Sequence, residues 1–410
     1  MEKPVFAIVG ASLAGGRAAE ALRAGGFDGR VVLVGAEEHA PYERPPLSKR
    51  FLTGQATAAD LLLRPSWDDL DVELVTGERV VAVSAADRSV ELESGRRFAA
   101  DKVLLATGGR NRPLPVEGTD LAGVFRLRDI GHATALGPAL AAAENVVVVG
   151  AGFIGLEVAA TAHTLGCRVT VVEAASVPLA RGLGPTWGAF VAEQHIDRGV
   201  RVGAGVGVRA ILGRARVRGV ELADGTVLPA DCVVVGVGLE PRTELARGLG
   251  LAVDDGIVVD ASARTSNPAV FAAGDATVQP AWWQDGRVRL ESYQNAREQA
   301  EVAAAAMLGL PVPTRRPPWF WSDQFDMNIQ VAGSLSRFDQ VAFRGDAGAR
   351  RFAAFHLTRG RVTGVLAVNR GRDVRAGMEL IEYAVPVGAA ELEDESVDLR
   401  RLARAVARSV

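Results

Sequence analysis

The sequence of 410 residues contains little cysteine, little lysine and no long apolar run. Its two cysteines, Cys167 and Cys232, provide neither a disulfide framework nor a C-x-x-C pair for redox or metal chemistry. The most apolar region, residues 146–166, is interrupted by Glu157 and several glycines. It therefore falls short of the roughly 18 unbroken apolar residues of a membrane helix. A formal net charge of -3 excludes a general basic surface for nucleic acid or anionic lipid.

Two further expectations come from the amino-terminal residues and from the histidines. The chain passes from Met1 and Glu2 directly into a predicted strand, without a basic region, an apolar stretch and a cleavage site in series. We therefore expect a cytoplasmic protein. The histidines have no metal-ligand spacing, so we predict no metal site and a structural role for all five: His39, His132, His163, His195 and His356.

A unit of strand, glycine-rich turn, alanine-rich helix and second strand occurs twice in the chain. In the first copy these are residues 5–9, 10–15, 16–24 and 31–34. In the second copy they are residues 146–149, 150–155, 156–165 and 169–173. Short apolar strands that alternate with helices are typical of parallel sheets covered on both faces. We therefore predict an α/β fold with two doubly wound, Rossmann-like nucleotide-binding domains.

Other segments alternate apolar and polar residues with a period of two, which is typical of antiparallel strands. Two small antiparallel inserts are expected at residues 80–83 with 89–92, and at 219–222. The region from about residue 317 changes character: it contains predicted strands at 340–344, 352–357 and 362–368, and an amphipathic helix at 398–408. These patterns predict a separate carboxy-terminal α+β domain.

The second glycine turn carries a full dinucleotide-binding fingerprint. Gly150, Gly152 and Gly155 follow a strand and open a helix, with Phe153 and Ile154 between them. The first glycine makes the tight turn, the second lets the backbone approach a pyrophosphate, and the third lets the helix pack closely. The helix N-terminus adds partial positive charge. Glu173 ends the next strand and is expected to accept hydrogen bonds from a ribose.

The first glycine turn departs from this fingerprint. Gly10 and Gly15 are present, but Ser12 replaces the middle glycine, and Ala36 stands where an acidic residue is expected. We still predict nucleotide binding at this turn, with Glu37 as the ribose ligand. Two alternatives stay open: Glu38 binds the ribose instead, or both glutamates belong to a solvated turn.

Two nucleotide folds in one chain suggest a flavoenzyme, in which a bound flavin meets a transient nicotinamide. Three strand ends fit such a site. They are Ala106-Thr107-Gly108, Gly236-Val237-Gly238 and Gly274-Asp275. The acid of the last segment is placed to bind sugar or ribityl hydroxyls.

These motifs, taken together, resemble the FAD-dependent ferredoxin reductases of bacterial oxygenase systems, the family of putidaredoxin reductase and biphenyl dioxygenase ferredoxin reductase. The resemblance covers nearly the whole chain. Besides the two glycine turns it rests on residues 44–49 (Arg-Pro-Pro-Leu-Ser-Lys), 106–109, 155–157, 272–275 and 319–324 (Trp-Phe-Trp-Ser-Asp-Gln). One mismatch is Ala36, where members of the family have Asp.

The resemblance implies FAD in the first domain and NADH, as a substrate, in the second. It divides the chain into an FAD-binding domain (1–110 and 236–316), an NAD-binding domain (111–235) and the carboxy-terminal domain (317–410). The FAD contacts that we expect, from motif and resemblance together, are Gly10, Ser12, Ala14, Gly15, Glu37, Arg44, Pro45, Lys49, Val80, Ala106, Thr107, Gly108, Arg128, Gly274, Asp275, Tyr293 and Trp321. The expected NAD contacts are Gly150, Gly152, Phe153, Ile154, Gly155, Glu157, Glu173, Gly236 and Gly238. Pro46 would wall one flavin face together with Pro45.

Lys49 and Glu157 are the predicted catalytic pair. Only three of the 46 basic residues are lysines, so a lysine directly after a rigid Pro-Pro segment suggests a need for a compact ammonium group. Beside the flavin N5 it could pair with Glu157, which the resemblance places at the nicotinamide amide. The alternative is an ordinary surface lysine.

The predicted activity is that of a ferredoxin–NAD(+) reductase, an FAD flavoprotein that uses NADH to reduce a small iron–sulfur ferredoxin. The ferredoxin is expected to be of the two-iron, two-sulfur type and to feed a haem monooxygenase or a ring-hydroxylating dioxygenase. The protein is expected to be a monomer or a homodimer. A rubredoxin reductase and an NADH oxidase stay open as alternatives, and so does a flavin-based redox-sensing or interaction protein.

Relatives that reduce disulfides need paired cysteines, and Cys167 and Cys232 offer none, so both are expected to be buried and inert. Electrons would then leave the flavin directly to an external carrier. A basic rim could receive an acidic ferredoxin, although scattered solvated arginines explain the same residues equally well. The arginines in question are Arg64, Arg287, Arg289, Arg297, Arg315 and Arg316.

Overall fold

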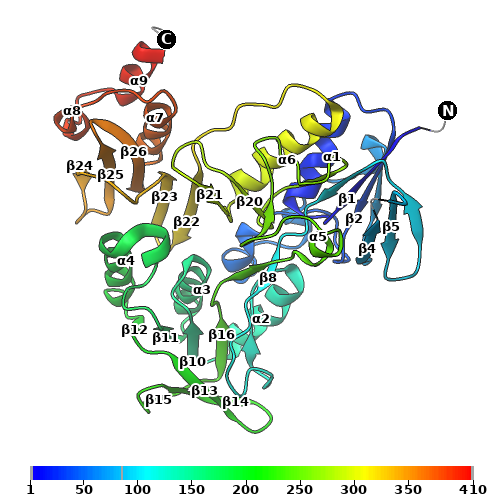
Figure 1. Ribbon diagram of the computed structural model, residues 1–410. Coiled ribbons are helices and arrows are strands. Elements are labelled where there is room, and N and C mark those ends of the chain that lie inside the picture. Colours follow the sequence, from blue (N-terminus) through cyan, green and yellow to red (C-terminus); the bar gives the residue numbers. More distant parts are fainter. Residues whose placement is uncertain (1–2, 85, 408–410) are drawn as a thin grey trace. The chain divides into compact units, whose positions relative to one another are not determined.

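The computed structural model describes residues 3–84 and 86–407, which form two compact units (Figure 1). The first unit contains the chain up to Glu43, Ala59–Arg110 and Glu240–Trp319. The second contains Arg44–Ala58, Asn111–Leu239 and the chain from Phe320 onward. Met1 and Glu2 lie outside the described residues.

The first unit is built on a parallel sheet with the strand order β19-β7-β1-β2-β3. The strands are β1 (Val5–Val9), β2 (Arg30–Val34), β3 (Val72–Val75), β7 (Lys102–Leu105) and β19 (Val270–Ala272). Helices α1 (Leu13–Ala24) and α6 (Tyr293–Leu308) pack side by side on this sheet (Figure 1). The central strands are almost fully buried, because both faces of the sheet are covered by apolar clusters.

Smaller elements complete the first unit. An antiparallel sheet contains β4 (Val80–Ser84), β5 (Ser89–Leu92) and β6 (Arg97–Ala99). A mixed sheet contains β18 (Ile257–Val258), β20 (Thr277–Pro280) and β21 (Arg287–Val288), in which β18 is parallel to β20 and β21 is antiparallel to it. The short helices are η2 (Ala59–Leu61), η3 (Asp68–Leu70) and α5 (Glu244–Gly248). Strands β8 (Gly109–Asn111) and β17 (Leu239–Pro241) form a two-stranded sheet.

The second unit repeats the parallel design with the strand order β12-β11-β10-β16-β9. Its strands are β9 (Val124–Phe125), β10 (Asn145–Val149), β11 (Arg168–Glu173), β12 (Arg201–Ala204) and β16 (Cys232–Val235). Its helices are η1 (Pro45–Ser48), α2 (Ile130–Ala142), α3 (Phe153–Thr164) and α4 (Ala180–Ile196). An antiparallel insert follows, made of β13 (Val208–Gly213), β14 (Val217–Leu222) and β15 (Val227–Pro229).

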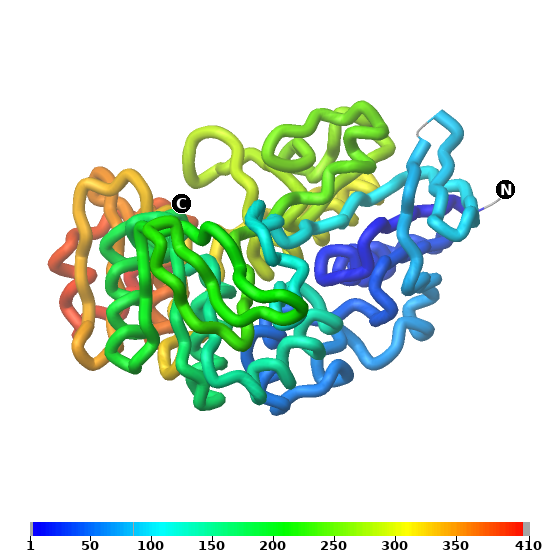
Figure 2. The backbone as a smooth tube through the Cα atoms, turned by 90° about the horizontal axis from the view of Figure 1, so that it is seen from below, coloured from blue at the N-terminus to red at the C-terminus, as the bar shows by residue number. Residues whose placement is uncertain are grey.

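The last part of the second unit is a sheet with the order β22-β23-β26-β25-β24, covered by helices. The strands are β22 (Trp319–Gln324), β23 (Met327–Gly333), β24 (Gln340–Asp346), β25 (Arg351–Thr358) and β26 (Arg361–Val368), and the helices are α7 (Gly371–Glu382), α8 (Ala389–Glu393) and α9 (Leu399–Ala407). In Figure 2 this part runs from orange to red beside the green segment that contains α4, whose Trp187 stacks on Phe352 of β25. No helix within residues 3–84 and 86–407 is long and apolar enough to cross a bilayer.

The predicted elements are present, and they differ mainly at the starts of helices. The two repeat helices were expected to begin at Gly16 and Leu156, but they begin at Leu13 and Phe153. Each begins directly after its cap residue, Ser12 or Gly152, because the glycine turn already bends the chain into the helix. The inserts and the three carboxy-terminal strands also match their predicted positions. The predicted terminal helix is α9, and Arg408 lies outside the described residues.

Candidate functional site

The glycine turns of both units require residues without a side chain. Gly10 and Gly150 have φ angles of 115° and 102°, in the region that L-residues avoid. A Cβ atom at Gly10 would lie 2.1 Å from the carbonyl oxygen of Ala106, and one at Gly150 would lie 2.4 Å from that of Gly236. The turns therefore lie directly against the ends of β7 and β16, as the two fingerprints require.

The remaining glycines of these turns serve two different purposes: two allow a helix to pack closely, and one leaves space for a ligand. Gly15 and Gly155 allow α1 and α3 to approach the turns, since a Cβ at either position would lie about 2 Å from the carbonyl oxygen of Gly10 or Gly150. Gly152 is exposed, and a Cβ there would meet no atom within 4 Å. The second turn therefore has open space above its middle glycine, where a pyrophosphate is expected.

In the first unit, the Gly274-Asp275 segment lies against the start of α1. Gly274 has a φ angle of 84°, and a Cβ at this position would lie 3.2 Å from the Cβ of Ala14. Its amide donates to the Gln299 Oε1 atom at 2.8 Å, and the Thr277 hydroxyl donates to its carbonyl oxygen at 2.9 Å. Asp275 thus follows a turn that is fixed at the carboxyl end of the parallel sheet, where ligands bind in such folds.

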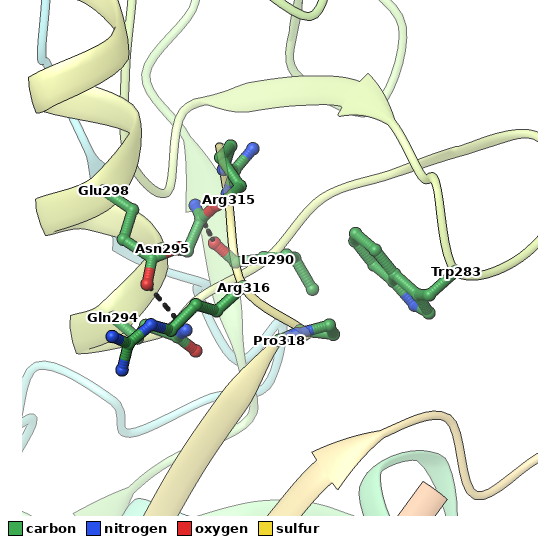
Figure 3. A pocket seen from close by; sticks show the side chains of 8 residues that line it. All are labelled: Trp283, Leu290, Gln294, Asn295, Glu298, Arg315, Arg316 and Pro318. Atoms are coloured by element: carbon green, nitrogen blue, oxygen red, sulfur yellow. Dashed lines mark hydrogen bonds between the residues drawn. The ribbon is translucent and has the colours of Figure 1, made fainter. Parts of the chain in front are cut away.

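A buried polar network lies against this turn, and Figure 3 shows two of its members, Asn295 and Arg315. Gln299 donates to Gln279 at 3.1 Å, and Gln279 donates to the Asn295 side chain at 2.7 Å. Arg315, which lies between α6 and β22, donates to both Gln279 and Asn295. Burial lowers the pKa of Arg315. It is therefore a structural cation rather than part of a basic rim.

Of the other predicted FAD contacts of the first unit, three form side-chain hydrogen bonds within that unit and one is buried in its core. Tyr293 begins α6, and its hydroxyl donates to Glu43 at 2.7 Å; burial raises the pKa of this phenol. Glu37 follows β2, and its carboxylate accepts from the Tyr42 hydroxyl at 2.5 Å. Thr107 donates to the carbonyl oxygen of Arg242 at 2.7 Å. Val80 is buried in an apolar cluster with the core strands.

The five remaining predicted FAD contacts belong to the second unit: Arg44, Pro45, Lys49, Arg128 and Trp321. Arg44 caps the short helix η1, which Pro45 begins, and it donates to the carbonyl oxygen of Arg128. The rigid Pro-Pro start of η1 places Ser48 and Lys49 beside α3.

Lys49 and Glu157 form an ion pair, with 2.8 Å between the Lys49 Nζ and Glu157 Oε1 atoms. Only 4% of the Glu157 side chain is exposed, against 23% for Lys49. The Glu157 carboxylate also accepts from the Ser48 hydroxyl, the Ser322 hydroxyl at 2.8 Å and the Asp323 amide at 3.3 Å. Such a set of donors is what a buried carboxylate needs.

A second carboxylate joins this group to the tryptophan of β22. The Asp323 Oδ2 atom lies 3.9 Å from the Lys49 Nζ atom and accepts from the Trp321 indole at 3.2 Å. Lys49 and Trp321 therefore share one neighbour, although 272 positions separate them in the sequence.

Sequence reasoning missed Ser48, Ser322, Asp323 and the residue behind them, Gln324. The only signal was within residues 319–324, where Ser322 and Gln324 alternate with Trp321 and Asp323. This period of two predicts that the polar side chains of Ser322 and Gln324 point to the same face of a strand.

Glu173 lies at the carboxyl end of β11, as predicted, beside the second glycine turn. Its carboxylate accepts from the backbone amides of Ala151 and Ala175, at 2.7 and 2.8 Å. The residues that follow are small and apolar or neutral, from Ala174 to Val177. The carboxylate is thus held rigidly at the edge of the turn.

The two thiols are buried and unpaired, as expected. Burial raises the pKa of Cys167, whose thiol donates to the carbonyl oxygen of Leu140 at 3.2 Å, and raises that of Cys232 to about 12. The positive charge of Arg216 acts to lower the pKa of Cys232, but burial outweighs it, so neither thiol is activated. The predicted basic rim is weakened, because Arg64, Arg289 and Arg297 form ion pairs with acidic residues of the same chain.

Comparison with known proteins accounts for almost the entire chain. Residues 5–300 match the pyridine nucleotide-disulphide oxidoreductase family, and residues 319–403 match the reductase C-terminal family. The sequence is 41% identical to rhodocoxin reductase of Rhodococcus erythropolis, over 96% of this chain and 93% of the relative. It is 40% identical to the ferredoxin–NAD(+) reductase component of the biphenyl dioxygenase system of Paraburkholderia xenovorans, over 98% of both chains.

A solved structure shows the same fold. The structure is similar to that of putidaredoxin reductase in its covalent complex with putidaredoxin, with a TM-score of 0.95 and 37% sequence identity. The match covers 99% of this chain and 100% of the other.

Proposed function

The chain belongs to the pyridine nucleotide-disulphide oxidoreductase family, and from this premise we propose that it is an FAD-dependent ferredoxin–NAD(+) reductase. The membership confirms the predicted fold class and the predicted resemblance to ferredoxin reductases of oxygenase systems. It also confirms FAD and NAD(H) as the cofactors.

The residues of both units fit these groups. In the first unit, Gly10, Ala14 and the Gly274-Asp275 turn converge at the carboxyl end of the sheet, where the FAD would lie. In the second unit, the exposed Gly152 and the rigid Glu173 leave a cradle for NADH. When bound, FAD accepts a hydride as an electron pair and releases electrons singly.

The residues of the chain have separate tasks in this reaction. Lys49 provides a positive charge that is worth most to the more electron-rich, reduced ring. Glu157, fixed by its four donors, is proposed to hold the nicotinamide amide. Pro45 and Pro46, in the rigid η1 helix, are proposed to wall one face of the ring. Trp321 is proposed to lie at the edge that faces the ferredoxin.

One observation carries the proposal within the family. The Lys49–Glu157 pair is assembled in the described chain, whereas both thiols are buried and unpaired and lie outside that cluster. A relative that reduces disulfides would need an accessible pair of thiols. Electrons must therefore go to an external carrier.

The test is anaerobic addition of NADH to the purified protein, followed by a panel of ferredoxins. We expect NADH to bleach the flavin absorbance and a ferredoxin to restore it quickly. Oxygen consumption faster than ferredoxin reduction would identify an NADH oxidase instead. Slow reoxidation by every carrier, with a long-lived charge-transfer band, would favour a redox-sensing or interaction protein.

Finer aspects of the function are part of the same proposal. The relatives named above support a ferredoxin as the acceptor. We propose that this ferredoxin is of the two-iron, two-sulfur type and that it serves a haem monooxygenase or a ring-hydroxylating dioxygenase. A monomer or homodimer in the cytoplasm, where NADH is regenerated, fits this role. The domain boundaries predicted above, with a discontinuous FAD-binding domain, are retained as a proposal.

We expect the protein to prefer NADH over NADPH. The fixed Glu173 carboxylate would repel a 2′-phosphate and should disfavour NADPH by at least about tenfold in kcat/KM, or about 1.4 kcal/mol. Glu173→Gln keeps an acceptor for one amide and removes the charge, so it should narrow the preference with unchanged flavin content. Equal kcat/KM values for the two nucleotides in the parent protein would refute the assignment.

We also expect both thiols to be dispensable. Cys167→Ala and Cys232→Ala, alone or together, should leave ferredoxin reduction within about threefold of the parent rate, because buried thiols of raised pKa are poor nucleophiles. Steady-state reduction of a ferredoxin by NADH measures this. Loss of turnover with FAD still bound would reveal a disulfide mechanism.

A further inference from the structure

Behind the donors of Glu157 lie further buried polar residues of the second unit that have no task in the proposed reaction. Ser322 and Gln324 of β22 and His195 of α4 are all fully buried, with 0% exposure. Burying polar groups is costly unless they are hydrogen-bonded. Their partners therefore decide why they are present.

These residues form one continuous chain of hydrogen bonds, called the hydrogen-bond chain below, that ends at the Lys49–Glu157 pair. The His195 Nε2 atom lies 2.8 Å from the Gln324 Oε1 atom. The Gln324 Nε2 atom lies 3.0 Å from the Ser322 Oγ atom, and that hydroxyl lies 2.8 Å from the Glu157 Oε1 atom. The same Glu157 oxygen lies 2.8 Å from the Lys49 Nζ atom.

The chemistry of the groups gives the hydrogen-bond chain a single direction. A carboxylate can only accept, so the Ser322 hydroxyl must donate to Glu157. The Ser322 oxygen is then left to accept, and the Gln324 amide nitrogen donates to it. The Gln324 carbonyl oxygen therefore faces His195 and needs a donor. His195 must carry its proton on Nε2.

From this direction we propose that His195, through Gln324 and Ser322, is a positioning residue that orients the Glu157 carboxylate for the nicotinamide. The inference rests on the role proposed above for Glu157. It assigns a function to the Ser-x-Gln pair of β22 and to one of the five histidines.

The surroundings keep His195 in the required form. Burial lowers its pKa to about 4, so the ring is neutral at neutral pH and keeps one protonated nitrogen. The ring of Phe325 packs against it edge-on, with 5.0 Å between the ring centroids. A fixed ring gives the hydrogen-bond chain a fixed first donor, in the way that outer-shell partners orient the ligands of a metal site.

The first test determines which ring nitrogen of His195 carries the proton, and it does not depend on enzymatic turnover. The FAD-loaded protein is labelled with ¹⁵N-histidine, and the His195 signals are assigned by their loss in His195→Gln. Long-range ¹H–¹⁵N spectra at neutral pH should show the Nε2–H tautomer. A Nδ1–H tautomer would overturn the direction of the hydrogen-bond chain and, with it, the proposal.

The second test removes different hydrogen bonds of the series from His195 to Glu157 by substitution. The dissociation constant of NAD⁺ for the oxidised protein is measured by titration of the flavin absorbance. His195→Leu, Gln324→Leu and Ser322→Ala should each weaken binding about fivefold, the loss expected for one hydrogen bond. His195→Gln places an amide donor near the Nε2 position and should restore affinity to within about twofold of the parent.

A double variant and a matched control show whether a loss of NAD⁺ affinity comes from the positioning of Glu157 or from a general loss of protein stability. The His195→Leu, Ser322→Ala double variant should bind NAD⁺ no more weakly than either single variant, since the same hydrogen-bond chain is broken once or twice. His356 is equally suited as a control: it is 2% exposed, burial also lowers its pKa to about 4, and it contacts Trp187 instead. His356→Leu should leave NAD⁺ affinity within about twofold of the parent, even where the melting temperature falls.

Two outcomes contradict the inference for different reasons. If His356→Leu and His195→Leu weaken NAD⁺ equally, or if the double variant is additive, the hydrogen-bond chain does not position Glu157. If Glu157→Ala itself leaves NAD⁺ affinity unchanged, the proposed role of Glu157 fails, and the inference fails with it. The tautomer of His195 still reports separately on the direction of the hydrogen-bond chain.

Discussion

Replacing Lys49 by methionine is expected to slow the reduction of bound FAD by NADH roughly 10²-fold, the loss found for single preorganised electrostatic contacts. Methionine retains the length of the side chain and removes its charge. The Lys49 ammonium lies 2.8 Å from Glu157 and 3.9 Å from Asp323, so it is fixed before the reaction starts. A fixed charge that stabilises the reduced ring more than the oxidised ring accelerates the chemical step.

Anaerobic stopped-flow absorbance at saturating NADH measures this effect. FAD content should be unchanged, because the glycine turn of the first unit and the Gly274-Asp275 turn are intact in the variant. Lys3→Met is the matched control, since Lys3 is an exposed lysine that donates to a backbone carbonyl. A Lys49→Met rate near that of the parent would identify Lys49 as an ordinary surface lysine.

Replacing Glu157 by alanine is expected to lower both the free energy of unfolding and the affinity for NAD⁺. The change leaves the Ser322 hydroxyl without its acceptor and the Lys49 ammonium with only Asp323, at 3.9 Å. Because Lys49 is partly exposed and keeps Asp323 nearby, we expect a loss of about 1–3 kcal/mol in the free energy of unfolding, the cost of unsatisfied buried polar groups. The dissociation constant of NAD⁺ should rise by at least about tenfold, if Glu157 contributes one charged hydrogen bond to the amide.

Urea unfolding at fixed FAD saturation measures the first quantity, and titration of the flavin absorbance with NAD⁺ measures the second. Glu144→Ala provides the control, because Glu144 forms an ion pair with Arg168 in which both side chains are more than half exposed. That variant should unfold within about 0.5 kcal/mol of the parent. Loss of FAD before any loss of NAD⁺ affinity in Glu157→Ala would contradict the assignment of Glu157 to the nicotinamide.

The glycine turns show why part of the site could be predicted. Gly10 and Gly150 need positive φ angles, and Gly15 and Gly155 lie against backbone oxygens only a few residues away. These constraints act over a short stretch of chain, so they leave a local pattern in the sequence. The start of each helix was placed three residues late, because the turn and the first helical turn share residues.

The surroundings of Lys49 and Glu157 show why other parts could not be predicted. The pair itself was expected from the resemblance, but three of its neighbours were not. Ser48, Ser322 and Asp323 are ordinary polar residues whose types carry no signal of their own. They meet Glu157 only because β22 returns to α3 after more than 160 residues. Arg315 was among the arginines for which a basic rim and a solvated surface both stayed open, and neither alternative foresaw that the fold buries it against Gln279 and Asn295.

The sequence by itself determined the two nucleotide folds, the carboxy-terminal domain and the lack of a dithiol, since each follows from short-range periodicity, glycine spacing or residue counts. The tertiary structure alone decided which polar side chains became buried neighbours of Glu157. It also decided that Glu173 is held by two amides and that the candidate rim arginines Arg64, Arg289 and Arg297 are ion-paired. The physical reason is that hydrogen bonds and ion pairs require contact within a few ångströms, and contacts between distant segments exist only after the sheets have formed.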